Sequence, residues 1–151
     1  FKHMKTSCGI LIINQCEEIL LGHATGKTYW DIPKGELQSD ETPIQCAIRE
    51  CKEETALIVQ PEVLKEIGLL PYHDKKRLYL FLTYVRKEDI DLKRLICTSF
   101  FEHPYTKKNT PEIDGFKWVN LTEYEVDKYC SLSMARLLKK LLERIRPGSD
   151  R

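Results

Sequence analysis

Short apolar runs separated by polar and turn residues predict several strands along this chain. The run at 7–14 (SCGILIIN) is apolar without polar alternation, which is typical of a strand buried on both faces. It is expected to form a hairpin with the next run, and a second antiparallel pair is expected around a turn at 73–76. The expected strands cover residues 7–14, 18–23, 62–72, 77–86 and 114–120.

Two segments have helical periodicity. In the segment 42–55, Thr42 is suited to cap the N-terminus, Pro43 suits the first helical position, and apolar residues recur at helical spacing. A second, amphipathic helix is expected at 131–146, and Pro147-Gly148 ends it. The expected apolar positions are Ile44, Ala47, Ile48 and Cys51 in the first helix, and Leu132, Ala135, Leu138 and Leu142 in the second.

The stretches without such a pattern are also informative. Residues 29–35 (YWDIPKG) contain Pro33 and Gly35, which predict a loop with a little strand before it. Residues 87–113 form a long, weakly patterned connection, and loops of that length in compact domains are often functional. Strands interleaved with two separate helices predict an α/β fold with a mixed sheet between helices.

Composition excludes several classes of protein. The chain has 151 residues, 24 Lys plus Arg and 23 Asp plus Glu, so its formal net charge is +1 and it is not a strongly basic nucleic-acid binder. Its six cysteines show neither the C-x-x-C nor the zinc-type spacing, which favours reduced thiols and a cytoplasmic location. No apolar run is long enough to span a membrane, so no membrane association is expected. We expect the native chain to start at Met4, with residues 1–3 as an addition.

Three carboxylates of the 42–55 helix are the main candidates for chemistry. At about 100° per residue, Glu50, Glu53 and Glu54 fall within one narrow arc, away from the apolar face. Like charges so close together repel one another, and Mg²⁺ or Mn²⁺ relieves this because both ions prefer oxygen ligands. The alternative is a solvated acidic face without a ligand.

The surrounding residues favour the metal site. From Gly35 the chain continues with Glu41 and then Arg49-Glu50-Cys51-Lys52-Glu53-Glu54. This pattern resembles the Nudix box, G-x5-E-x7-R-E-U-x-E-E-x-G-U, the signature of the Nudix hydrolase family. The chain departs from the signature at Ala56, where the family has glycine, and at Cys51, where it has an aliphatic residue.

The resemblance implies a fold and a set of roles. The fold would be the α/β/α sandwich of the family, as a single domain over residues 4–147. Mg²⁺ or Mn²⁺ would be held by the Gly35 carbonyl, Glu50, Glu53 and Glu54, with Arg49 and Glu41 orienting these carboxylates. The simpler alternative for Arg49 is a surface ion pair with Glu53 or Asp40.

The reaction implied is hydrolysis of a phosphoanhydride bond, with a carboxylate as general base. Glu50 and Glu53 are candidates for the base on the helix, and Glu112 resembles a loop glutamate that precedes the last strand in many members. Glu102 is a weaker candidate in the same loop, and the alternative for Glu112 is a solvated turn residue. The R-E-x-x-E-E core is intact, which argues against a regulator that binds nucleotides without hydrolysing them. Such a non-catalytic protein remains the alternative to an enzyme.

The sequence indicates the reaction more closely than it indicates the substrate. The segment Trp30-Asp31-Ile32-Pro33-Lys34-Gly35 resembles the W-x-x-P-K-G of dinucleoside-polyphosphate hydrolases, so a substrate of the diadenosine tetraphosphate type is expected first. Triphosphate RNA 5′ ends, ADP-ribose or nucleotide sugars, and nucleoside triphosphates are the alternatives. The candidate substrate contacts are Lys34, Tyr72, Lys75, Arg77 and Tyr105.

For these contacts and for the second helix, other interpretations stay open. Lys34, and the cations at 75–77, can equally be solvated turn residues. The basic stretch 136–146 can touch RNA or a partner, or it can pack its leucines on the sheet with its lysines facing water. The sequence also leaves the oligomeric state open, with a homodimer as one arrangement.

Overall fold

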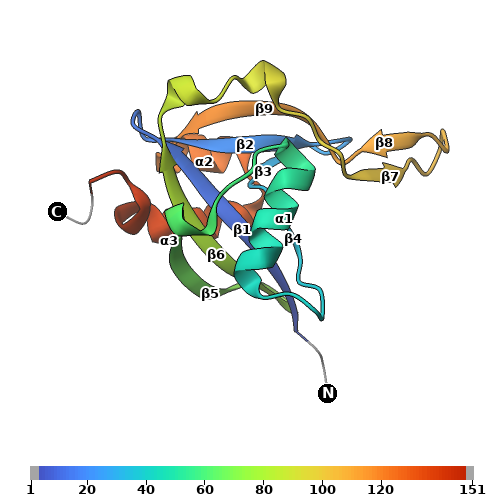
Figure 1. Ribbon diagram of the computed structural model, residues 1–151. Coiled ribbons are helices and arrows are strands. Elements are labelled where there is room, and N and C mark those ends of the chain that lie inside the picture. The colour runs from blue at the N-terminus through green and yellow to red at the C-terminus, as the bar shows by residue number, and fades with distance from the viewer. Residues whose placement is uncertain (1–3, 149–151) are drawn as a thin grey trace.

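The structure, a computed structural model, describes residues 4–148 and is built around one mixed sheet (Figure 1). Strand β1 (Lys5–Asn14) lies at its centre, parallel to β6 (Lys76–Val85) and antiparallel to β2 (Glu18–Ala24). The main path runs β3-β2-β1-β6-β5, while β4 pairs with β1 and β9 with β2. The other strands of this sheet are β3 (Trp30–Asp31), β4 (Lys34–Glu36), β5 (Lys65–His73) and β9 (Ile113–Asn120).

Helices cover both faces of the sheet, which confirms the expected α/β architecture with a mixed sheet between helices. Helix α1 (Pro43–Thr55) packs on one face, while α2 (Glu123–Tyr129) and α3 (Leu132–Ile145) pack on the other. No helix within residues 4–148 is long and apolar enough to cross a membrane.

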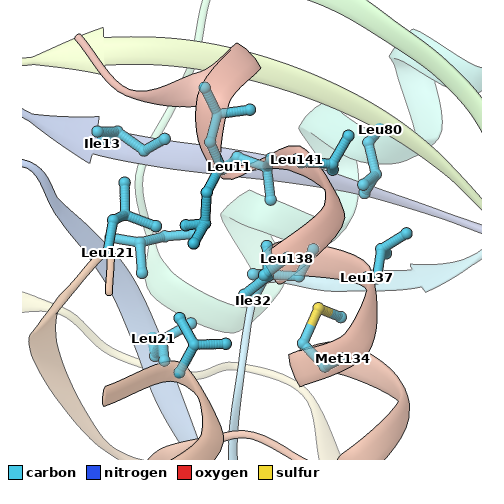
Figure 2. Close-up of a cluster of buried hydrophobic side chains, with 14 of the residues drawn as sticks. Leu11, Ile13, Leu21, Ile32, Leu80, Leu121, Met134, Leu137, Leu138 and Leu141 are labelled. Atoms are coloured by element: carbon cyan, nitrogen blue, oxygen red, sulfur yellow. The ribbon is translucent and has the colours of Figure 1, made fainter. Parts of the chain in front are cut away.

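The position of β1 between the two helix layers explains the apolar run in its sequence. Successive side chains of a strand point to opposite faces. Leu11 and Ile13 therefore join the cluster under α3, shown in Figure 2, whereas Ile10 and Ile12 join the cluster under α1. All four are at most 1% exposed, so the prediction of a strand buried on both faces is confirmed.

The second helix forms close to where it was expected, but one of its predicted core residues is wrong. Ser131 accepts a hydrogen bond from the Met134 amide and caps the helix. Leu132, just after the cap, is 75% exposed, because at about 100° per residue it lies on the side of the helix away from the buried stripe. The buried stripe consists of Met134, Ala135, Leu137, Leu138, Leu141, Leu142 and Ile145.

The segment 87–113 contains more regular structure than its pattern indicated. Two 3₁₀ turns, Lys87–Asp89 and Leu92–Arg94, precede a small hairpin of β7 (Phe100–Glu102) and β8 (Asn109–Pro111). Figure 1 shows this hairpin projecting from the body of the molecule.

Strand β5 begins at Lys65, three residues later than expected. A third 3₁₀ turn, Pro61–Val63, precedes it, because proline suits the first position of a helical turn.

Candidate active site

Helix α1 begins and ends at well-defined caps. The Thr42 hydroxyl accepts from the Gln45 amide, and the Gln45 side chain accepts from the Thr42 amide, so the two residues form a capping box. At the other end, Ala56 has φ 73° and ψ 2°, a left-handed conformation that favours glycine. The departure from the box at Ala56 therefore leaves the helix exit in the geometry that glycine would adopt.

Arg49 binds three carboxylates at once. Its Nε and Nη2 donate to the two oxygens of Glu41 over 3.0 and 2.8 Å, and its Nη1 donates to Glu50 over 2.9 Å and to Glu53 over 3.1 Å. The guanidinium holds the pKa of Glu41 down at about 2. Arg49 thus fixes the direction in which Glu50 and Glu53 point, and it makes no ion pair with Asp40 among the described residues.

Gly35 lies directly against Glu50. A Cβ built on Gly35 would stand 1.9 Å from the carboxyl carbon of Glu50, so any side chain at this position would displace that carboxylate. The Gly35 carbonyl accepts a weak hydrogen bond from the Cys46 thiol over 3.5 Å. The pKa of Glu50 is raised, mainly by burial and further by the charges of Glu53 and Glu112.

Glu54 is the most buried acid of the site. Its carboxyl accepts from the Lys34 amide over 3.2 Å, and the residue is only 9% exposed. Burial, together with the charge of Glu50, raises its pKa to about 8. Two neighbouring carboxyls with raised pKa values are the kind of pair that a bound cation stabilises in the ionised form.

The oxygen atoms of this site are ligands that a hard divalent cation binds, but the side chains do not point at one common position. Carboxylate and carbonyl oxygens are the ligands that Mg²⁺ and Mn²⁺ prefer. Within residues 4–148, no three acidic, histidine or cysteine side chains are gathered closely enough to hold a metal ion. Glu50 and Glu53 instead both form ion pairs with Arg49.

The long connection returns to the end of α1. The Thr98 amide and hydroxyl both donate to the Glu53 carbonyl, over 2.6 and 3.0 Å. Ser99 in turn bonds Glu112 through both backbone and side chain. Glu112 is exposed, and its charge contributes to the raised pKa of Glu50, so the fold brings this loop acid into the electrostatic range of the helix acids. Glu102 lies on the projecting hairpin, on β7.

The candidate substrate contacts do not form one patch. Lys34 is no solvated turn cation: its side chain is 17% exposed, and its Nζ pairs with Asp31 over 3.1 Å. The opposite charge of Asp31 keeps the Lys34 pKa high despite burial. Tyr72 lies beside Lys34, with the ammonium 5.9 Å from its ring centre.

The remaining contacts are spread over different faces. Tyr72 packs against the core under α3, whereas Arg77 precedes Leu78 of that same core and so points to the opposite face. The Nε of Arg77 is buried without a hydrogen-bond partner among the described residues. Lys75 is exposed at the β5–β6 turn, and Tyr105, 88% exposed, lies between β7 and β8, far from that turn in Figure 1.

Asp31 is a residue of the site that was not predicted from the sequence. The sequence does contain a signal for it, because Asp31 and Lys34 are opposite charges three residues apart around Pro33.

All six cysteines are free thiols, as expected.

The mixed sheet, helix α1 and the acid cluster of Glu50, Glu53 and Glu54 agree with the fold and site that the Nudix box implies. The NUDIX domain family matches residues 3–141, which is most of the chain. This protein therefore belongs to the Nudix family, and it is a Nudix hydrolase.

Several known proteins are similar to it. A protein of Enterobacteria phage T4, described as an uncharacterized 17.7 kDa protein in the e-segB intergenic region, is 32% identical over 132 residues, covering 81% of this chain and 87% of the relative. The RNA pyrophosphohydrolase of Marinomonas sp. (strain MWYL1) is 31% identical over 132 residues, covering 77% and 75%. The crystal structure of a C. elegans Ap4A hydrolase binary complex has the same fold, with a TM-score of 0.60 and 24% identity over 91% of this chain and 94% of the other.

Proposed function

We propose that this protein is a metal-dependent pyrophosphohydrolase that acts on the 5′-triphosphate end of RNA. The observation that carries the reaction is the group of Glu50, Glu53 and Glu54 on one arc of α1. Gly35 lies directly against Glu50, and Arg49 holds Glu50 and Glu53. The similarity to RNA pyrophosphohydrolases over most of the chain supports the substrate.

The proposed metal ligands are the Gly35 carbonyl and the carboxylates of Glu50, Glu53 and Glu54. Bound there, Mg²⁺ or Mn²⁺ would neutralise the phosphate chain and lower the pKa of a water molecule. Glu54 would give up its proton when it becomes a ligand, because its pKa of about 8 means that it is mostly protonated at pH 7. Arg49 would keep Glu50 and Glu53 directed toward the phosphates, with Glu41 holding the far side of the guanidinium.

The proposed chemistry is the addition of water across one phosphoanhydride bond. The water oxygen joins phosphorus, the bond from that phosphorus to the leaving phosphate oxygen breaks, and a carboxylate takes the proton of the water. Glu53 is our first candidate for this base, since its side chain is 40% exposed and can reach water. Glu112 is the second, because it is exposed and its charge acts on Glu50.

Dinucleoside polyphosphates are the second candidate substrate. The segment Trp30–Gly35 resembles that of dinucleoside-polyphosphate hydrolases, and the fold is shared with an Ap4A hydrolase. This candidate ranks second because Lys34, the cation of that segment, is already paired with Asp31 and largely buried.

A substrate panel tests the proposal. Triphosphate RNA, diadenosine tetraphosphate, ADP-ribose, a nucleotide sugar and nucleoside triphosphates are incubated with Mg²⁺ or with EDTA, and the products are separated by ion-exchange chromatography. We expect Mg²⁺-dependent cleavage, with the highest kcat/KM for triphosphate RNA. Cleavage of another substrate class at a higher kcat/KM would refute the assignment to RNA, and binding of nucleotides without cleavage would indicate a regulator.

Variants test the assignment of the base. Glu53→Gln is expected to lower kcat by at least about 10²-fold, the usual contribution of a general base. Glu62→Gln, an exposed acid in the 3₁₀ turn before β5, serves as the control and should retain the parent rate. If Glu53→Gln is as active as the control and Glu112→Gln is not, then Glu112 is the base.

A further inference from the structure

A groove runs between the edge strand β5 and helix α3, on the face of the sheet opposite α1. It encloses about 470 Å³. Apolar and aromatic side chains form its floor, and cations form its rim. Its main lining residues are Leu70, Tyr72 and His73 from β5, and Arg136, Leu137 and Lys140 from α3.

The charge of this groove is one-sided. Arg136 and Lys140 are both exposed, and neither makes an ion pair with a described acidic residue, whereas their neighbour Lys139 is paired with Asp127 over 2.8 Å. Within residues 4–148, no acidic side chain lines the groove. Arg136 and Lys140 are four residues apart on α3, so their side chains stand about 6 Å apart on one face of the helix. Two unpaired cations above an apolar floor are complementary to a phosphate chain that carries bases.

The groove connects with the candidate active site through Tyr72. The Tyr72 ring lines the groove and lies against the Lys34 ammonium. The Lys34 amide donates to the carboxyl of Glu54, one of the proposed metal ligands. Lys34 and Tyr72 therefore lie between Glu54 and the groove, and the groove continues from Tyr72 along α3.

We propose that the groove between β5 and α3 binds the nucleotides of single-stranded RNA that follow the 5′ end, with Arg136 and Lys140 contacting phosphates and Tyr72 contacting a base. This inference rests on the proposed function and specifies how much of the RNA the protein holds. Aromatic rings stack on bases without regard to sequence, and the half-buried ring of Tyr72 lines the groove. The groove would therefore favour long RNA over mononucleotides while leaving the sequence unread.

Binding is measured separately from cleavage. The probe is a fluorescent 12-nucleotide RNA with a 5′-monophosphate, and its Kd is determined by anisotropy at several salt concentrations. Two phosphate contacts on a single strand contribute about −1.4 to the slope of log K against log salt, or about a sevenfold loss of affinity between 50 and 200 mM salt. The double variant Arg136→Gln/Lys140→Gln is expected to lose this contribution.

A matched control is available on the other face of the sheet. Lys93 and Arg94 are the same two residue types, both exposed, in the 3₁₀ turn whose Leu92 packs with the core under α1. Lys93→Gln/Arg94→Gln should keep the parent slope, and thermal melting checks that both double variants are folded. A parallel assay compares kcat/KM for triphosphate RNA of 2 to 8 nucleotides, where the groove variant should lose the gain with length that the parent shows.

The outcomes separate the two proposals. Equal slopes for the parent, the groove variant and the control would overturn the groove, as would the absence of any binding of this RNA. A reduced slope in the groove variant alone supports it. If that reduced slope occurs in a protein that cleaves no triphosphate RNA, the groove stands and the proposed function falls.

Discussion

Burial of the Glu54 carboxyl makes a quantitative prediction about the metal-free protein. The pKa of this group is about 8 in the folded chain and 4.5 in its ordinary state. Between these pH values the folded protein holds a proton that the unfolded chain has released. The free energy of unfolding therefore falls as pH rises through this window, by about 1.4 kcal/mol per pH unit for this one group.

The variant Glu54→Gln removes the titration while it keeps the shape of the side chain. Between pH 5.5 and 7.5 the parent should lose about 3 kcal/mol of stability through this carboxyl, and the variant should not. The amide oxygen of glutamine can still accept the hydrogen bond from the Lys34 amide. We expect the variant to be the more stable protein at pH 7.5 in EDTA, even though it lacks a proposed metal ligand.

Urea unfolding in EDTA at several pH values measures the difference. Glu62→Gln is the control, because Glu62 is an exposed acid in the 3₁₀ turn before β5 and its removal keeps the buried carboxyl that produces the slope. Added Mg²⁺ should stabilise the parent more at pH 8 than at pH 6, since binding requires the ionised carboxylates. Parallel pH curves for the parent and Glu54→Gln would refute the reasoning.

Three further predictions concern single positions. Ala56→Gly should raise the free energy of unfolding, measured by urea titration, by about 0.5–1 kcal/mol. Glycine removes the strain of the left-handed backbone at the end of α1, and this gain exceeds the added conformational entropy of the unfolded chain. An unchanged free energy of unfolding would mean that the cap is unstrained. Arg49→Lys cannot bind Glu41 through two nitrogens, so it should lower kcat/KM or the Mg²⁺ affinity by about 10- to 100-fold. A variant that matches the parent in both kcat/KM and Mg²⁺ affinity would contradict this. Leu138→Ala should cost about 2–5 kcal/mol, whereas Leu132→Ala should cost less than about 0.5 kcal/mol, and similar losses would mean that the burial of α3 is misassigned.

Local pattern was enough to predict most of the fold and the composition of the site. The box helix carries its own start signal in Thr42 and Pro43, so its position depends little on the rest of the chain. The strand at 7–14 is apolar at every position that the two helix layers cover, which is why its double burial could be predicted. By contrast, α2 is only seven residues long with a single buried residue, Val126, so it leaves almost no periodicity to detect.

The spacing of the sequence placed the three acids on one arc, but only the tertiary structure decided how each of them behaves. Glu53 and Glu54 are neighbours in the chain, yet the side chain of Glu53 is partly exposed and that of Glu54 is buried against the Lys34 amide. This burial raises the pKa of Glu54.

The same distinction holds for the basic residues. Lys34 is one of the cations that the sequence offered for substrate contacts, and the packing of Asp31 and Tyr72 around it removed it from solvent. For the basic stretch of α3, the structure confirms that the leucines pack on the sheet, and it places Arg136 and Lys140 at the groove, where contact with RNA stays a proposal. A chain determines periodicity and residue chemistry locally, but solvation depends on which distant segments cover each side chain, and that is fixed only when the sheet and its helices assemble.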